Sequence, residues 1–261
     1  RLSDAFAAGG KVRILTNTIT SPSTKKLVSE FVAANPSADI KHVCYDAVSV
    51  SGMLEANKES FGVSALPTYD LSKAKSIVSI GADFMNSFPS SLELTSQYAK
   101  GRKPENGWMS KHFQFEAALS LSGTNADVRM PMKPSEYGKT IVAIYNYLNG
   151  NKSGVAPKVK MAAEHLMANK GESIVLCGLN DKNIQNVVVA INQMLGNYGK
   201  TIDIDKPSFQ RQGVDADVAG LVKELKGGSV DVLIIDGANP VYNMPADMDF
   251  KGAMSKAKTS I

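Results

Sequence analysis

The chain has 261 residues, 43% of them hydrophobic, which is enough for one large α/β domain or two smaller ones. Its 29 basic and 25 acidic residues give a net charge of +4 and are interleaved, with no basic run that contains aromatic residues. This argues against nucleic-acid binding, and no apolar run reaches the roughly 18 residues that indicate a membrane span. The chain begins at Arg1 without Met or a signal sequence and ends in a charged, Ala-rich stretch, so we expect it to be a segment of a longer protein.

The first part of the chain predicts alternating strands and helices. Lys11–Thr16 has the composition of a buried strand, and Ser21 followed by Pro22 is a typical helix start, with the helix ending near Ala34. Further strands are expected at Asp39–Tyr45, Ile77–Ile80, Met109–Phe115 and, as an edge strand, Val128–Met132. Further helices are expected at Ser51–Phe61, from about Pro89, and at Ser135–Leu148, with a loop at Gly62–Tyr69.

The second part repeats this plan after a Gly- and Asn-rich linker, Asn149–Pro157. The expected elements are a helix at Lys158–Ala168, a strand at Glu172–Gly178, helices at Ile184–Leu195 and Val218–Leu225, and a buried strand within Ser229–Pro240. Strands that alternate with helices predict an α/β fold with parallel sheets. We therefore expect two Rossmann-like α/β domains, at residues 1–150 and 151–261.

The two parts look like copies of one plan. The stretch SIVSIGADF ends in Gly81-Ala82-Asp83, and SVDVLIIDGANP ends in Gly237-Ala238-Asn239, in each case after a buried strand. Each is preceded, at a similar distance, by a strand that turns into a capped helix. This layout indicates an internal duplication, although few residues are identical.

Function is expected where the strands end, because open parallel sheets bind ligands outside the carboxyl ends of their strands. Four such turns are candidates: Thr16–Thr20, Gly81–Asp83, Gly178–Asp181 and Gly237–Asn239. None contains G-x-G-x-x-G or G-x-x-x-x-G-K-[ST], which argues against NAD or ATP bound in the usual way. Ser21, Asn180 and Asp181 are better explained as helix caps. No G-x-S-x-G turn or Cys–His pair is present, so we identify no catalytic residue.

The sequence also argues against metal centres within this segment. Cys44 and Cys177 lie far apart and belong to no C-x-x-C pair, so an iron–sulfur cluster or structural zinc held here alone is nearly excluded. Both lie at the ends of apolar runs and are interpreted as small buried side chains. A disulfide between them would require the two halves of the chain to touch at these positions. His42, His112 and His165 have no second ligand at metal spacing and are expected to be structural.

The long irregular stretch between QYAKGR (97–102) and MSKHFQFEAALSLSGTNADVRMPMKPSE (109–136) carries a family resemblance. Together with KVRILTNTITSPS, HVCYDAVS, SIVSIGADF, IVLCGLNDKNIQNVVVAINQMLGNYG and VDVLIIDGANPVYNMP, it resembles the large iron–sulfur subunit of bacterial alternative complex III. The resemblance covers most of residues 11–245. It implies that the chain matches the second and third domains of the molybdopterin-enzyme fold, as in formate dehydrogenase and dimethyl sulfoxide reductase.

In active members of that fold, the strand ends cradle the guanine dinucleotide tails of the cofactor. The resemblance therefore implies a vestigial dinucleotide cradle made by Asn239, Gly237, Asn197, Gly178 and Gly81. Two departures imply that molybdopterin is not bound. Tyr137 stands where a carboxylate would accept hydrogen bonds from guanine, and Asp83 would repel a phosphate. No metal ligand is implied in this segment, and iron–sulfur clusters are expected elsewhere in the full-length protein.

The resemblance implies a non-catalytic part of an electron-transfer subunit in a quinol-oxidising respiratory chain. It further implies a periplasmic location, membrane association through partner subunits, and contact with an iron–sulfur domain of the same polypeptide. Two alternatives remain open: the cofactor-cradling part of an active molybdopterin oxidoreductase, and a periplasmic binding module with two lobes that close on a small ligand.

Overall fold

The computed structural model describes residues 6–261, which fold into two compact units. Unit 1 consists of Arg1–Ser51 and Phe209–Ile261, and unit 2 consists of Gly52–Ser208. This division differs from the expected one at 1–150 and 151–261, because strands from both ends of the chain pair in one sheet. The expected linker, Asn149–Pro157, lies within unit 2 between two consecutive helices.

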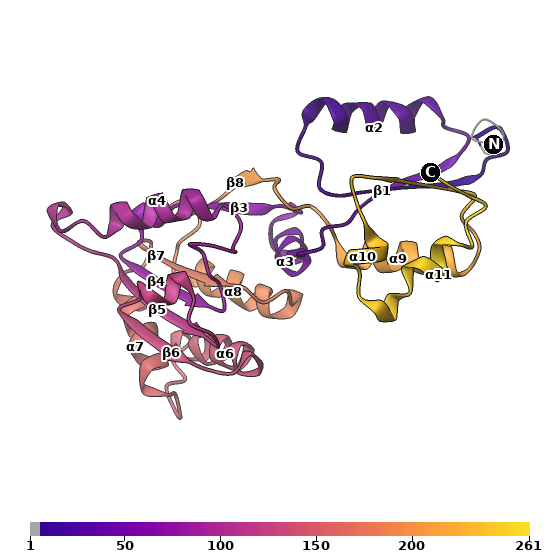
Figure 1. Cartoon of the computed structure of the whole chain (residues 1–261). Helices are drawn as coiled ribbons and strands as arrows, with labels where there is room; N and C mark the ends of the chain where they lie inside the picture. The colour runs from indigo at the N-terminus through magenta and orange to yellow at the C-terminus, as the bar shows by residue number, and fades with distance from the viewer. Residues whose placement is uncertain (1–5) are drawn as a thin grey trace. The chain divides into compact units, whose positions relative to one another are not determined.

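Unit 1 is built on a four-stranded parallel sheet (Figure 1). Its strands, in spatial order, are β10 (Thr259–Ser260), β9 (Val232–Asp236), β1 (Lys11–Thr16) and β2 (Asp39–Cys44). Helix α2 (Pro22–Ala34) lies on one face, and α9 (Asp215–Lys226) and α11 (Phe250–Met254) lie on the other. The core is on the α9 side, where Leu15, Val43 and Leu233 pack with Leu221 and Leu225. Helix α2, in contrast, buries none of its residues.

Unit 2 contains a second parallel sheet and a separate antiparallel pair. The parallel sheet has the order β6 (Val128–Pro131), β5 (Lys111–Glu116), β4 (Ser76–Ile80) and β7 (Ser173–Cys177). One face carries α6 (Tyr137–Leu148), α7 (Pro157–Ala168) and α8 (Lys182–Met194), and the other carries α4 (Ser91–Gly101), as Figure 1 shows. The antiparallel pair is β3 (Leu66–Tyr69) with β8 (Ile202–Ser208). Helix α3 (Ser51–Phe61) precedes β3.

In each sheet, one pair of neighbouring strands joins the first half of the sequence to the second. β9 lies beside β1 in unit 1, and β4 lies beside β7 in unit 2. In each pair, a strand that ends at a Gly-Ala turn lies beside a strand that leads to a capped helix. Gly81 and Gly237 both adopt positive φ, +61° and +66°, which glycine tolerates without strain. Two parallel sheets interleaved with helices confirm the expected α/β class with two Rossmann-like units.

Most expected elements are present within two residues of their predicted bounds, and the caps are correct. Ser21 accepts from Thr24 N at the start of α2, and Asp181 accepts from Ile184 N at the start of α8. The prediction of a loop over Gly62–Tyr69 was wrong, because its last four residues form β3. No strand was predicted at β8, because its sequence, IDIDKPS, contains two Asp, one Lys and one Pro among seven residues. Both strands owe their extended form to pairing with each other across a long sequence separation.

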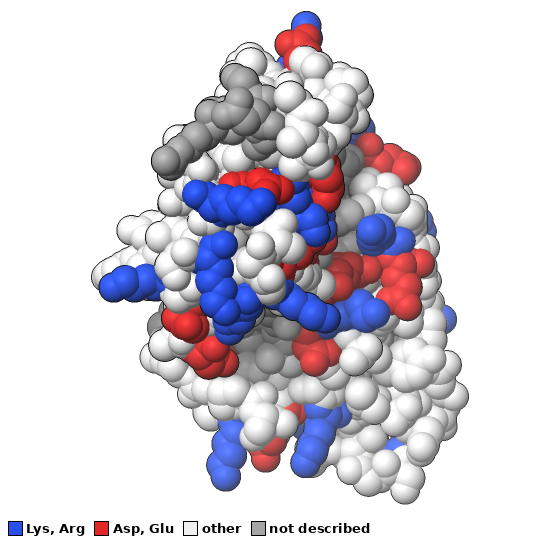
Figure 2. Space-filling view, turned by 90° about the vertical axis from the view of Figure 1, so that its right-hand side faces the viewer, with Lys and Arg blue, Asp and Glu red and all other residues white. Residues whose placement is uncertain are grey.

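Charged residues of both signs are mixed on the face shown in Figure 2. Within unit 1, the buried Arg13 joins Glu224 of α9 to Asp39 of β2, with nitrogen–oxygen distances of 2.6 and 2.9 Å. The guanidinium hydrogen bonds hold the pKa of Asp39 and of Glu224 below their usual values. Among residues 6–261, no helix has both the length and the apolar composition that a membrane span requires.

Candidate ligand-binding site

Unit 1 has a polar crevice at the carboxyl ends of its two central strands. The chain runs from β1 to β2 on one side and from β9 to β10 on the other, so it leaves these neighbouring strands in opposite directions. Such a switch point is where open parallel sheets bind ligands. The crevice has a volume of about 350 Å³ and is lined by the loops after β1, β2 and β9 and by residues 210–211.

Two of the predicted site residues, Gly237 and Asn239, line this crevice. A Cβ on Gly237 would lie 3.1 Å from Asn17 Oδ1, on the loop that follows β1. The Asn239 side chain accepts a hydrogen bond from Tyr242 N at 3.3 Å and caps the short helix α10 (Pro240–Asn243). The two residues therefore shape one wall of the crevice, and the side-chain oxygen of Asn239 is already engaged as a cap.

Asp46 holds the opposite loops together. Its carboxylate accepts hydrogen bonds from Thr18 Oγ1 at 2.7 Å, Gly213 N at 2.8 Å and Gln212 N at 3.0 Å. Gly213 packs so closely that a Cβ there would lie 2.8 Å from Asp46 N. These bonds satisfy the charge of Asp46 internally and fix the segment that carries Arg211.

Arg211 supplies the positive charge of the crevice. Its side chain lines the crevice and is half-buried. Within residues 6–261 no hydrogen bond or ion pair reaches its guanidinium, although its neighbours are well connected. Nearby, burial raises the pKa of Tyr45, so that phenol stays protonated at neutral pH. A partly desolvated guanidinium with free donors favours an anion, most of all one with several oxygens.

The equivalent place in unit 2 is filled by the protein itself. A Cβ on Gly178 would lie 2.0 Å from Gly81 O, and a Cβ on Gly81 would lie 2.6 Å from the Tyr137 ring. The Tyr137 hydroxyl accepts a hydrogen bond from Ala117 N at 2.7 Å, which fixes the ring over Gly81. Gly81 and Gly178 are thus required by close packing. The four strand ends of the sequence belong to two different sheets, and the structure leaves the unit 1 pair open to a ligand.

Asn197, another predicted site residue, is fully buried in unit 2. Its amide donates to Asn192 Oδ1 at 2.9 Å and its carbonyl oxygen accepts from Ser173 Oγ at 3.0 Å. Asn192 in turn bonds both polar groups of the Val175 backbone, at 3.0 Å each. These hydrogen bonds hold β7 against α8, so the role of Asn197 in this structure is to support the packing of unit 2.

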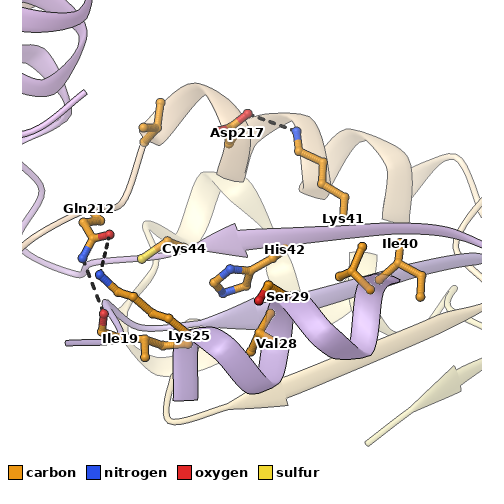
Figure 3. Close-up of a pocket in the computed structure, with 12 residues that line it drawn as sticks. Ile19, Lys25, Val28, Ser29, Ile40, Lys41, His42, Cys44, Gln212 and Asp217 are labelled. Carbon is orange, nitrogen blue, oxygen red and sulfur yellow. Dashed lines mark hydrogen bonds and ion pairs between the residues drawn. The ribbon is translucent and has the colours of Figure 1, made fainter. Parts of the chain in front are cut away.

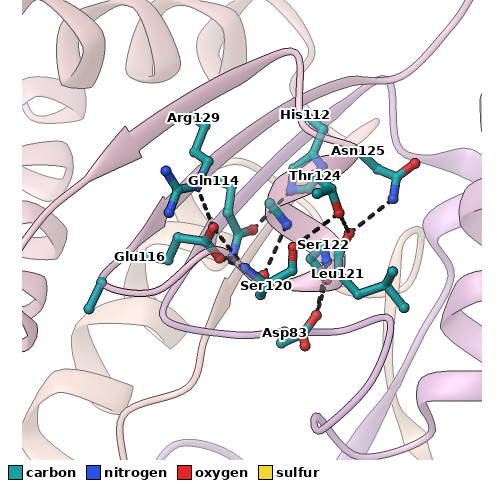
Figure 4. A network of polar contacts seen from close by, with 12 residues as sticks. Asp83, His112, Gln114, Glu116, Ser120, Leu121, Ser122, Thr124, Asn125 and Arg129 are labelled. Carbon is teal, nitrogen blue, oxygen red and sulfur yellow. Dashed lines mark hydrogen bonds and ion pairs between the residues drawn. The ribbon is translucent and has the colours of Figure 1, made fainter.

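A polar network anchors the irregular stretch after β5 in unit 2 (Figure 4). Glu116 is almost fully buried and accepts hydrogen bonds from Arg129 Nε at 2.6 Å, Gln114 Nε2 at 3.1 Å and Ser120 N at 3.2 Å. Burial raises the pKa of Glu116, but the bonds from Ser120 and Arg129 outweigh it and keep that pKa below its usual value. Asp83, expected to repel a phosphate, instead accepts from Ser122 N and Oγ at 3.0 and 2.7 Å. The network therefore ties a loop to the sheet.

The histidines and cysteines lie at separate places. His112 is fully buried between Tyr98 and Gln114, and burial lowers its pKa to about 4. His165 packs on the Phe113 ring, with 5.6 Å between ring centroids. Cys44 and Cys177 are both free thiols, and Cys177 alone is fully buried. Among residues 6–261, no three His, Cys, Asp or Glu side chains are grouped as metal ligands.

No family model and no curated protein matches this chain. Among solved structures, the chain is similar to one from the formyltransferase/hydrolase complex FhcABCD of Methylorubrum extorquens, determined with methylofuran. The TM-score is 0.59 at 13% sequence identity, and the match covers 92% of this chain and 74% of that chain. At this identity the likeness establishes the fold alone.

This finding corrects the family assignment drawn from the sequence. The structural match is to a formyltransferase/hydrolase complex, so the assignment to alternative complex III and to a quinol-oxidising respiratory chain is wrong. The motifs that carried the resemblance lie largely in strands, caps and tight turns, which the fold alone requires. The periplasmic location and the iron–sulfur clusters outside this segment stay predictions.

Sequence reasoning missed Arg211 and Asp46, the two charged residues of the crevice. Both lie in loops far apart in the sequence and belong to no recognised motif. Only a weak sequence signal points to Asp46: it directly follows the predicted strand Asp39–Tyr45, as the four candidate turns follow their strands. Arg211 carries no local signal, because its place depends on the return of the chain to unit 1 at Phe209.

Proposed function

We propose that unit 1 binds a small phosphate-bearing molecule in the crevice at the ends of β1 and β9. The observation that carries this proposal is the half-buried guanidinium of Arg211, which has no partner within residues 6–261 and faces a polar crevice. A guanidinium presents a planar fork of donors that matches the oxygens of a phosphate. The volume of about 350 Å³ suits a ligand of mononucleotide size or smaller.

The rest of the lining favours binding over catalysis. Asn17 and Asn243 bring amide groups, which offer both donors and acceptors to a sugar or a base. The one carboxylate, Asp46, is held by several donors, and the phenol of Tyr45 stays protonated. We therefore propose a ligand-binding role for this crevice, with Arg211 as the anchor.

An Arg211→Met variant should bind phosphate-bearing ligands at least about tenfold more weakly than the wild type, because it loses a charge-assisted pair of hydrogen bonds. Isothermal titration calorimetry with inorganic phosphate, AMP and glucose 6-phosphate measures this. The matched control is Lys251→Met, which removes one positive charge from the exposed surface of unit 1. Equal affinity of the wild type and Arg211→Met for each of these ligands would contradict the proposal.

We further propose that the chain works together with partner subunits. The support is twofold: its structural neighbour belongs to a multi-subunit complex, and Leu119, in the loop after β5, and Leu121, the first residue of the short helix α5 (Leu121–Thr124), are 63% and 53% exposed. Large apolar side chains exposed two residues apart favour a protein contact. Full-length protein isolated from its natural source should migrate in size-exclusion chromatography as a larger assembly, and a Leu119→Asp/Leu121→Asp variant should release it. A single-chain mass for the wild type would argue against this second role.

A further inference from the structure

A second cavity in unit 1 lies between helix α2 and strand β2, with a volume of about 640 Å³ (Figure 3). Figure 3 shows side chains of the helix and of the strand directed into the space between them. Its lining shares no residue with the crevice that contains Arg211. A cavity of this size is within the range of small-molecule sites.

One wall of the cavity is apolar and incompletely covered. Val28 and Val32 of α2 and Ile40 of β2 line it, and all three are only half-buried. A helix on a sheet normally buries an apolar stripe against it, whereas α2 buries no residue at all. The cavity accounts for this difference, because it separates the stripe from the sheet. An apolar ligand body would remove these side chains from water.

His42 offers a defined hydrogen-bond acceptor to the cavity. Thr16 Oγ1 donates to Asn17 O at 2.7 Å, so it must accept from His42 Nε2, which lies 2.8 Å away. His42 is exposed on the edge strand β2, and its partial desolvation lowers its pKa, so the neutral ring predominates at pH 7 and its Nδ1 carries a lone pair. No partner of Nδ1 occurs within residues 6–261. An N–H or O–H group on a ligand is the complement of this atom.

Lys25 offers a positive charge beside the same space. Its Nζ lies 3.3 Å from Gln212 Oε1 and 5.1 Å from the centre of the Phe209 ring, both of which are neutral. In the described part of the chain Lys25 has no carboxylate partner, whereas Lys41, which points from the opposite side of β2, is paired with Asp217 of α9 at 3.0 Å (Figure 3). A carboxylate on a ligand would complete the contacts of Lys25.

We propose that this cavity binds a small amphipathic acid with an apolar body, one carboxylate for Lys25 and one N–H or O–H donor for His42 Nδ1. The apolar body would lie against Val28, Val32 and Ile40. This site is independent of the phosphate-binding role proposed for Arg211, since the two cavities have separate linings.

The test uses three related probes on the whole chain. Indole-3-acetate has the carboxylate and the N–H, 1-methylindole-3-acetate lacks the N–H donor, and tryptamine carries an ammonium in place of the carboxylate. Isothermal titration calorimetry should show one site for indole-3-acetate, about fivefold weaker binding of the methylated acid, and no binding of tryptamine. The Lys25→Met variant should bind indole-3-acetate about tenfold more weakly than the wild type, and it should lose most of the preference for indole-3-acetate over tryptamine. His42→Phe should make the two acids bind equally, and Arg211→Met should change none of these affinities.

A chemical readout locates the ligand. Cys44 lines the cavity and is partly exposed, whereas Cys177 is buried in unit 2 and serves as an internal reference. Saturating indole-3-acetate should slow alkylation of Cys44 by iodoacetamide at least about fivefold and leave the Cys177 rate unchanged, since an occupied cavity blocks the approach to Cys44 Sγ. An unchanged Cys44 rate at saturation, equal affinity of the wild type and Lys25→Met, or no binding of either acid at millimolar concentration would overturn the proposal.

Discussion

A Gly178→Ala variant is expected to destabilise unit 2 by about 3 kcal/mol or more, because its new methyl group has no space. The added Cβ would lie 2.0 Å from Gly81 O and 2.7 Å from Gly81 C, and both atoms belong to the backbone. The backbone of Gly178 is itself fixed, since its N–H donates to Ile80 O at 3.0 Å. Relief of the overlap therefore requires β4 and β7 to separate at their carboxyl ends.

Urea unfolding followed by Trp108 fluorescence measures this change, because the single tryptophan of the chain lies in unit 2. The matched control is Gly138→Ala in α6 of the same unit, where the new Cβ would meet only the tip of the Ile184 side chain at 3.0 Å. That side chain can turn away, and alanine favours a helix over glycine, so the control should change stability by less than about 1 kcal/mol. A similar decrease in the free energy of unfolding for both variants would contradict the close contact between Gly81 and Gly178.

The stability of unit 2 should fall as the pH is lowered from about 6.5 to about 4, by an amount on the order of 3 kcal/mol from His112 alone. Burial lowers the pKa of His112 from 6.5 to about 4 in the folded chain. Between these values the unfolded chain binds a proton that the folded chain does not, so the free energy of unfolding decreases as the pH falls. Above pH 6.5 both states are neutral at this site and the effect vanishes.

Urea unfolding with Trp108 fluorescence at several pH values, for the wild type and a His112→Gln variant, measures this dependence. The variant should show a smaller pH slope between pH 6.5 and 4, even if its stability at pH 7 is lower. His165→Gln is the control, because His165 is only half-buried and should contribute less of the slope. An NMR titration in which the His112 ring protonates near pH 6 would contradict the expectation.

Local patterns predicted the elements that carry their own signals. Ser21-Pro22 and Asp181 marked helix starts because capping is a contact within one turn, and the apolar runs of β1, β4 and β7 marked strands buried on both faces. The pair β3 and β8 gave no such signal, because each strand is short and stabilised by the other. The same limit explains the family resemblance: turns such as Gly81-Ala82 and Gly237-Ala238 reflect the needs of a parallel sheet, and they do not distinguish one function from another.

The residues of the crevice, too, were only partly predictable from local sequence patterns. The turn at Gly237 and Asn239 was predicted as a ligand position from its place after a buried strand, and it lines the crevice. The glycines Gly81 and Gly178 follow the same pattern but face Tyr137 and each other, so the pattern by itself could not separate an open crevice from a filled one. That distinction depends on which distant side chain occupies the space.

The sequence by itself determined the α/β class, the helix caps and the turns at the strand ends, because each depends on contacts within a few residues. The tertiary structure decided which strands share a sheet, that unit 1 is formed from both ends of the chain, and that Arg211 lies in the crevice beside Gly237. These features depend on pairing between segments more than a hundred residues apart, such as β1 with β9. No local pattern encodes such pairing, because it is selected by the packing of the whole core.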